Sequence, residues 1–153
     1  MTPTEQATGA RRRARSLTVQ ALYQWQITGD DPGEIVVQFI EGRDTERADV
    51  EYFRDLMRAI PDRIATIDGA IEPLLERNLA LVDPVERAVL RLACFELLER
   101  WEVPARVVID EAVELAKRFG AEQGHRFVNG VVDRLAHGLR AREMDRRPDA
   151  ARD

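Results

Sequence analysis

The sequence predicts an all-α fold, and two observations support that prediction. Apolar residues recur every three or four positions along most of the chain, whereas no alternating apolar and polar run is long enough to propose a sheet. No repeat with a period of roughly 20 to 50 residues is visible, which argues against a solenoid. We therefore expect a compact bundle of about seven helices.

The first helix is expected over residues 11–26. One stripe of this helix should be core, because its members fall at helical spacing: Ala14, Leu17, Thr18, Ala21, Leu22 and Trp25. Arg11, Arg12 and Arg15 lie to one side of the stripe, together with Tyr23. Residues 1–10 are small and polar, and we expect them to form a mobile N-terminal segment before a helical domain over 11–139. Residues 140–153 read as a charged C-terminal tail.

Three further helices are expected in the first half of the chain. One starts at Pro32, after Gly29 and two aspartates end the first helix, and another covers residues 49–60. Pro61 should begin the next one, because proline is best accommodated in a first helical turn. That helix carries an apolar edge that ends at Leu74 and Leu75.

The helix over residues 85–98 is expected to be the spine of the fold. Asp83, Pro84 and Glu86 form a strong start signal, and the apolar side chains that follow point almost all round the axis. Cys94 lies among them and should be a small core residue. Glu96 also falls on an apolar side of this helix, and a buried carboxylate needs a partner. We expect an arginine or a hydroxyl group from another helix to supply it.

Two helices complete the domain, over residues 108–119 and about 122–137. Gly120 should end the first of them. Gly130 lies inside the second, where glycine costs about 1 kcal/mol relative to alanine. Close packing or exposed backbone would explain Gly130, and a tolerant position is the alternative.

The sequence shows no catalytic machinery, so we do not expect an enzyme. Two histidines and one cysteine are too few and too far apart for a zinc site, and no phosphate loop or nucleophile motif occurs. Asp110, Glu111 and Glu114 are expected to form a solvated helix face. We expect neither a cofactor nor a metal. No signal peptide or membrane span is recognisable, which favours a cytoplasmic protein.

Charge is distributed unevenly along the chain. The formal net charge is −5, which argues against a protein that coats nucleic acid by charge alone. Four arginines nevertheless cluster over residues 11–15, whereas residues 30–51 are mostly acidic. Any nucleic-acid site must therefore be local.

Four segments resemble the NusB family of bacterial transcription antitermination factors in order and spacing: RRRARSLTVQALYQWQ (11–26), VERAVLRLACFELL (85–98), VIDEAVELAKRFGAE (108–122) and FVNGVVDRL (127–135). The resemblance implies a fold of two small helical subdomains. It also implies two ligands, the boxA element of ribosomal RNA transcripts as single-stranded RNA and the ribosomal small-subunit protein NusE. The family acts within an antitermination complex that accompanies RNA polymerase.

The resemblance also implies site residues. The RNA surface would consist of the first-helix arginines and three residues near the last helix: Arg11, Arg12, Arg13, Arg15, Gln123, Arg126 and Phe127. The partner surface would include Tyr23 and Glu86. Guanidinium groups suit phosphate, and an aromatic ring can stack on an unpaired base. Periodicity alone, however, favours a core position for Phe127 over a stacking platform, and Glu86 fits a capping box fully, so its partner role rests on the resemblance.

This sequence departs from the family pattern at a few positions. Gln123 and Gly124 stand where the family often has an acidic residue followed by serine, which puts the RNA contact at Gln123 in doubt. A helical adaptor that binds protein and ignores RNA is the alternative function. A helix-turn-helix DNA-binding protein is less favoured, because no short turn precedes a helix rich in base-reading side chains.

Overall fold

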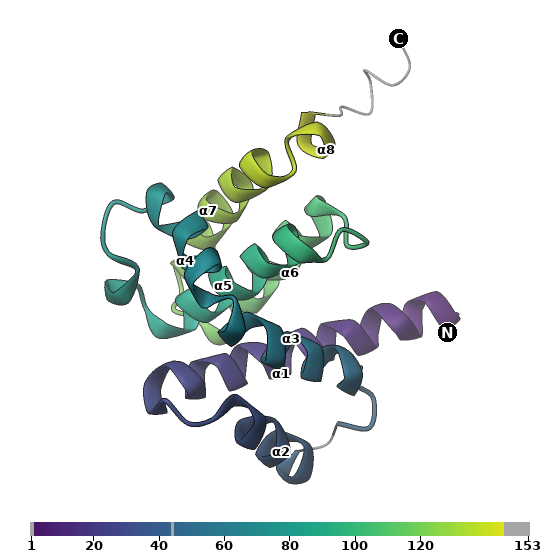
Figure 1. The fold of residues 1–153 in the computed structure, drawn as a ribbon. Coiled ribbons are helices and arrows are strands. Elements are labelled where there is room, and N and C mark those ends of the chain that lie inside the picture. The colour runs from purple at the N-terminus through teal and green to yellow at the C-terminus, as the bar shows by residue number, and fades with distance from the viewer. Residues whose placement is uncertain (1, 44, 146–153) are drawn as a thin grey trace.

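The computed structural model describes residues 2–43 and 45–145, and helices dominate this part of the chain (Figure 1). Eight α-helices occur in it: α1 (Pro3–Thr28), α2 (Pro32–Gly42), α3 (Val50–Asp62), α4 (Ile64–Ile71), α5 (Pro84–Glu99), α6 (Ala105–Phe119), α7 (Gly124–Leu139) and α8 (Ala141–Asp145). Two 3₁₀ helices, η1 (Glu72–Leu74) and η2 (Leu79–Leu81), lie between α4 and α5. The predicted all-α class is confirmed.

The helices form two groups that share α5. In the lower part of Figure 1, α1, α2 and α3 pack against one another, and in the upper part α4, α6 and α7 surround α5. α5 also packs along α1, which joins the groups. Ten of its sixteen residues are buried, so its predicted role as the spine is confirmed.

α1 begins eight residues earlier than residue 11, the start expected from the sequence. The Thr2 hydroxyl accepts a hydrogen bond from Glu5 N–H, and the Glu5 carboxylate accepts one from Thr2 N–H. Pro3 occupies the first turn, where its missing N–H costs nothing. This capping box starts the helix within the segment that was expected to precede the domain.

The prediction that Pro61 begins a helix is wrong. Pro61 lies in the last turn of α3, and α4 begins at Ile64. Arg63 makes the junction, because its N–H reaches the Ala59 and Ile60 carbonyls while its own carbonyl accepts from Ile67 N–H. Backbone hydrogen bonds on both sides of Arg63 therefore close one helix and open the next.

The expected charged tail begins with ordered structure. α8 covers residues 141–145, and Arg140, just before it, is 2% exposed. The Arg140 guanidinium donates to the carbonyls of Glu96, Leu97, Arg100 and Val103 and to the Glu143 carboxylate. It thereby satisfies carbonyl groups at the C-terminal end of α5 and in the following turn. Residues 146–153, the rest of the expected tail, lie outside the described residues.

Cys94 is fully buried in α5, as predicted, and its thiol points toward the Ile67 carbonyl at 3.7 Å. Burial, with a smaller contribution from Asp68, raises the pKa of Cys94 to about 12.

Gly130 has open space where a Cβ would stand, so close packing does not explain it. The open space agrees with the alternative, that this position of the helix simply tolerates glycine. Within the described ranges, no helix is both long and apolar enough to cross a membrane.

Candidate nucleic-acid interface and partner surface

The four arginines of α1 point in different directions, because successive helical residues are rotated by about 100°. Arg12 and Arg13 are exposed, Arg11 is half-buried and Arg15 is buried. The cluster that is continuous in sequence is therefore divided in space. Each arginine has its own surroundings, and these decide what it can bind.

Arg15 is part of a buried polar network on α5. Its Nε lies 2.9 Å from Glu96 Oε2 and 3.1 Å from Oε1, and the Tyr52 hydroxyl donates to the same carboxylate. Burial alone would lower the pKa of Arg15, but the Glu96 charge and hydrogen bond raise it. The predicted partners of Glu96, an arginine or a hydroxyl, are both present. Arg15 is only 4% exposed, so the structure offers no free guanidinium there for a phosphate.

Arg12 is held by a carboxylate on α6. Its Nε donates to Glu111 Oε1 at 2.6 Å, and this hydrogen bond and the Glu111 charge raise the pKa of Arg12. The expectation that Glu111 belongs to a solvated face is wrong, because Glu111 is buried whereas Asp110 and Glu114 are exposed. Its position three residues after Val108 and four before Leu115 places it on the apolar face of α6. That spacing was the signal for its burial.

Arg11 is paired with carboxylates, whereas Arg13 is not. The Arg11 guanidinium lies 3.9 Å above the Tyr52 ring and within 3.8 Å of Asp49 and Glu102 carboxylate oxygens. Arg13 has no carboxylate within ion-pair distance among residues 2–43 and 45–145. One arginine of the four is thus both exposed and uncompensated.

A groove of about 740 Å³ runs between α1 and α6 and reaches α7. Its charged lining is balanced, with three cations and three carboxylates: Arg12, Lys117, Arg118, Asp110, Glu111 and Glu114. Asn129 of α7 completes it. No signal in the sequence distinguishes Lys117, Arg118 or Asn129 as site residues, since charged residues near a helix end are also common on plain solvated surfaces.

The three residues at the start of α7 that the resemblance implies for the RNA surface lie outside that groove lining. Gln123 is exposed at the N-cap position without a side-chain capping bond, and Arg126 is exposed in the first turn. Phe127 is half-buried and packs against the core. The geometry is compatible with both the core interpretation and the stacking interpretation of Phe127.

The predicted partner residues Tyr23 and Glu86 have unlike surroundings. Tyr23 is 43% exposed and borders a mostly apolar groove of about 410 Å³. This groove is lined by residues from four helices, among them Val19, Ile27, Phe39, Val85 and Phe119. An exposed apolar groove with an aromatic at its edge suits a protein partner.

Glu86 is 7% exposed and does not line the groove beside Tyr23. Asp83 alone caps α5, because its side chain accepts from Val85 N–H and Glu86 N–H. The Glu86 carboxylate lies against Gly124, where a Cβ would approach it to 2.8 Å. Glycine at position 124 therefore permits this close packing. Burial, followed by the Asp83 charge, raises the pKa of Glu86.

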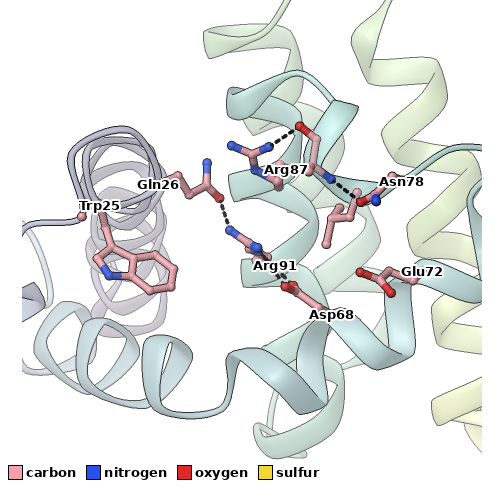
Figure 2. Close-up of a pocket in the computed structure, with 10 residues that line it drawn as sticks. Trp25, Gln26, Asp68, Glu72, Asn78, Arg87 and Arg91 are labelled. Carbon is pink, nitrogen blue, oxygen red and sulfur yellow. Dashed lines mark hydrogen bonds and ion pairs between the residues drawn. The ribbon is translucent and has the colours of Figure 1, made fainter.

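A second polar pocket, of about 450 Å³, lies between α1, α4 and α5 (Figure 2). Its main cation is already paired: Arg91 donates to both Asp68 carboxylate oxygens, at 3.0 and 2.9 Å, and to Gln26 Oε1. Figure 2 shows Arg91 between these two partners. Such a fork tying three helices together is a structural contact rather than an open binding site.

Comparison with known proteins identifies the family. A family model described as the NusB family matches residues 12–137. The chain belongs to the NusB family. The NusB protein of Idiomarina loihiensis, a transcription antitermination protein, is 50% identical over 131 residues, which are 86% of this chain and 94% of that protein. The NusB protein of Alkalilimnicola ehrlichii is 48% identical over 161 residues, covering 94% of this chain and 90% of its own.

Solved NusB structures share the fold. T. maritima NusB superposes with a TM-score of 0.73 at 38% identity, over 82% of this chain and 89% of its own. A chain in the crystal structure of antitermination factors NusB and NusE in complex with dsRNA gives a TM-score of 0.73 at 28% identity, over 83% of this chain and 96% of its own. The predicted NusB family and fold are confirmed. NusB proteins are transcription antitermination factors.

Proposed function

We propose that this chain binds the boxA element of ribosomal RNA transcripts together with NusE, and that the complex acts with RNA polymerase in antitermination. The protein would work in the cytoplasm by binding alone, with no catalysis of its own. The observation that carries this proposal is the similarity, over 83% of this chain, to a chain solved with NusE and RNA. The acidic net charge of −5 requires the RNA site to be local.

The α1 arginines supply the phosphate contacts in this proposal, with unequal roles. Arg13 is exposed and has no carboxylate partner within the part of the chain that the structure describes, and Arg12 is exposed at the edge of the α1–α6 groove. Arg15 is a positioning residue that does not contact RNA itself, because its ion pair with Glu96 holds α1 against α5. Gln123, Arg126 and Phe127 would contact the RNA at the start of α7, with Phe127 stacking on a base.

The partner surface is proposed on the other part of α1. NusE would lie against the apolar groove that Tyr23 borders. Glu86, which follows the groove-lining Val85 in the chain, would contribute a carboxylate outside the groove lining. Apolar cores with charged rims are typical of protein interfaces. The pairing of three α1 arginines with carboxylates is what favours the alternative, an adaptor that binds protein and ignores RNA.

Binding of labelled boxA RNA at several salt concentrations, with and without NusE, tests the proposal. We expect affinity to fall steeply with salt, and Arg13→Ala to weaken binding and reduce the log–log slope by about 0.7, as one phosphate contact on a single strand predicts. Arg142→Ala is the matched control, since Arg142 is exposed on α8, across the molecule from α1 (Figure 1). Absence of salt-dependent RNA binding, with NusE binding intact, would establish the adaptor instead. A duplex of the same sequence distinguishes single-stranded from double-stranded recognition.

A further inference from the structure

Glu111 occupies the Nε–H of Arg12, one of the groups that a ligand phosphate could otherwise bind. Its carboxylate accepts a hydrogen bond from Arg12 Nε at 2.6 Å, and the Arg12 side chain is 65% exposed. A guanidinium binds carboxylate and phosphate through the same N–H groups and in similar geometry. A phosphate that approaches Arg12 from solvent therefore meets a guanidinium that is already bound to the Glu111 carboxylate.

The two partners of this ion pair are held very differently. The Glu111 side chain is 11% exposed and fixed on the apolar face of α6, whereas Arg12 extends into solvent from α1. Glu111 Oε1 also lies 4.0 Å from an NH group of the buried Arg15. If Arg12 turned toward a ligand, Glu111 would keep Arg15 as a counter-charge, so the buried carboxylate would not be left unpaired.

We propose that Glu111 is an internal competitor for Arg12, which sets the affinity and selectivity of the RNA site. The proposal rests on the proposed function, in which the α1 arginines bind RNA. In the free protein the Glu111 carboxylate is bound to the Arg12 guanidinium. An RNA phosphate gains the Nε–H of Arg12, and with it the bidentate edge of the guanidinium, only by displacing this carboxylate. An isolated anion makes too few other contacts to do so, whereas an RNA that also contacts Arg13 and the start of α7 does.

Removing the competing charge should therefore tighten RNA binding. We expect Glu111→Gln to raise the affinity for single-stranded boxA RNA about 1.5- to fivefold, the range for releasing one partly exposed ion pair. Glu51→Gln is the matched control. Glu51 also pairs with an exposed arginine, Arg54 at 3.0 Å, and its replacement removes the same charge. A pure effect of net charge would raise the affinity of both variants alike.

A double-mutant cycle identifies Arg12 as the group that is released. In an Arg12→Gln background, Glu111→Gln should give no gain. Circular dichroism melting checks that each variant is folded. If Glu111→Gln does not fold, Glu111→Asp withdraws the carboxylate from Arg12 by one methylene and should give a smaller gain of the same sign. Unchanged affinity in the folded variant, or an equal gain without Arg12, would overturn the proposal.

A sulfate titration tests the competition at Arg12 separately from RNA binding, and so distinguishes failure of this proposal from failure of the proposed function. The Arg12 Nε–Hε signal in ¹⁵N-labelled protein, followed during a sodium sulfate titration at constant ionic strength, reports binding of a phosphate-like anion without RNA. We expect a larger sulfate-induced shift in Glu111→Gln than in the parent. If that difference appears but neither protein binds boxA RNA, the competition stands and the proposed function fails. If the parent binds boxA RNA while Glu111→Gln gains neither sulfate nor RNA affinity, the competition fails.

Discussion

At the scale of single residues, the buried carboxylate of Glu96 organises the interior around the α1 arginines. The Arg15 guanidinium and the Tyr52 hydroxyl both donate to it, from α1 and α3. The helical position of Glu96 among apolar residues was enough to predict burial and the kind of partner. Sequence alone could not predict that the partner is an arginine expected at the RNA surface, because that depends on how α1 packs against α5.

Replacing Tyr52 with phenylalanine removes one donor from this network and leaves the ring in place. We expect a loss of about 1 to 3 kcal/mol in the free energy of unfolding, because a buried carboxylate oxygen loses one of its two hydrogen bonds. Urea denaturation followed by circular dichroism measures it. Tyr23→Phe is the control, since Tyr23 is 43% exposed, and it should change stability by less than about 0.5 kcal/mol. Equal effects of the two variants would contradict the network's importance.

Glu86 should give a pH-dependent effect of defined sign. Burial raises its pKa in the folded protein, so the ionised form is less favourable there than in the unfolded chain. Its stabilising contribution is present below the unfolded pKa, about 4.3, and is lost as the pH rises through the raised folded value. Glu86→Gln should therefore melt at a higher temperature than the parent at pH 7. That advantage should disappear near pH 4, and a variant that melts lower than the parent at pH 7 would refute the assignment.

At the scale of elements, Arg140 shows how one side chain can complete a helix. Its guanidinium donates to four backbone carbonyls at and beyond the end of α5, and α8 then carries Glu143 back to the start of α6. The polar composition of residues 140–153 predicted a tail, because composition does not reveal hydrogen bonds to a distant helix end. By contrast, the apolar periodicity of α5, α6 and α7 was sufficient to predict those helices.

Helix boundaries were predicted less well than the helices themselves. The Thr2, Pro3 and Glu5 signature that starts α1 is visible in the sequence, but the small polar residues around it favoured a mobile segment. Pro61 has a first-turn preference that the backbone bonds of Arg63 override. Both errors concern helix ends, where local hydrogen bonds decide the boundary and residue composition does not.

Loss of the Arg140 contacts should destabilise the fold strongly. We expect Arg140→Met to lower the free energy of unfolding by about 3 kcal/mol or more, since several buried carbonyls would lose their donors while apolar volume is retained. Guanidinium denaturation quantifies the loss. The neighbouring Arg142→Met, at an exposed position of α8, should remain within about 0.5 kcal/mol of the parent. A comparably small effect at Arg140 would show that water replaces its hydrogen bonds.

At the scale of the whole molecule, α1 carries both proposed surfaces on one rigid element. Arg13 and Tyr23 are separated by about 15 Å of helix, and the helix is anchored between them by core contacts with α5. The family resemblance predicted which residues belong to each surface. It could not reveal that three of the four arginines are already paired with carboxylates. Those partners come from α5, from α6 and from the segments before α3 and after α5, all distant from α1 in sequence.

The adjoining positions of the two surfaces predict coupling between the two ligands. RNA and NusE bound side by side along α1 can contact each other, so each should raise the affinity for the other by the same factor. Calorimetric titration of boxA RNA into the free protein, and into the protein saturated with NusE, gives that factor in one direction. The reverse titration must give the same value. Release of NusE when RNA is added would mean that the surfaces overlap.

The burial of Cys94 allows transient opening of the core to be measured by thiol labelling. The chain's single cysteine is enclosed in α5, and its raised pKa keeps the thiol protonated at neutral pH. A thiol reagent needs an exposed thiolate, so it can react only when α5 separates from its neighbours. The rate of labelling by such a reagent therefore measures how often the centre of the molecule opens, in the unmodified chain and without an added probe. RNA and NusE, if they bind the closed form, should slow that rate in proportion to their affinity.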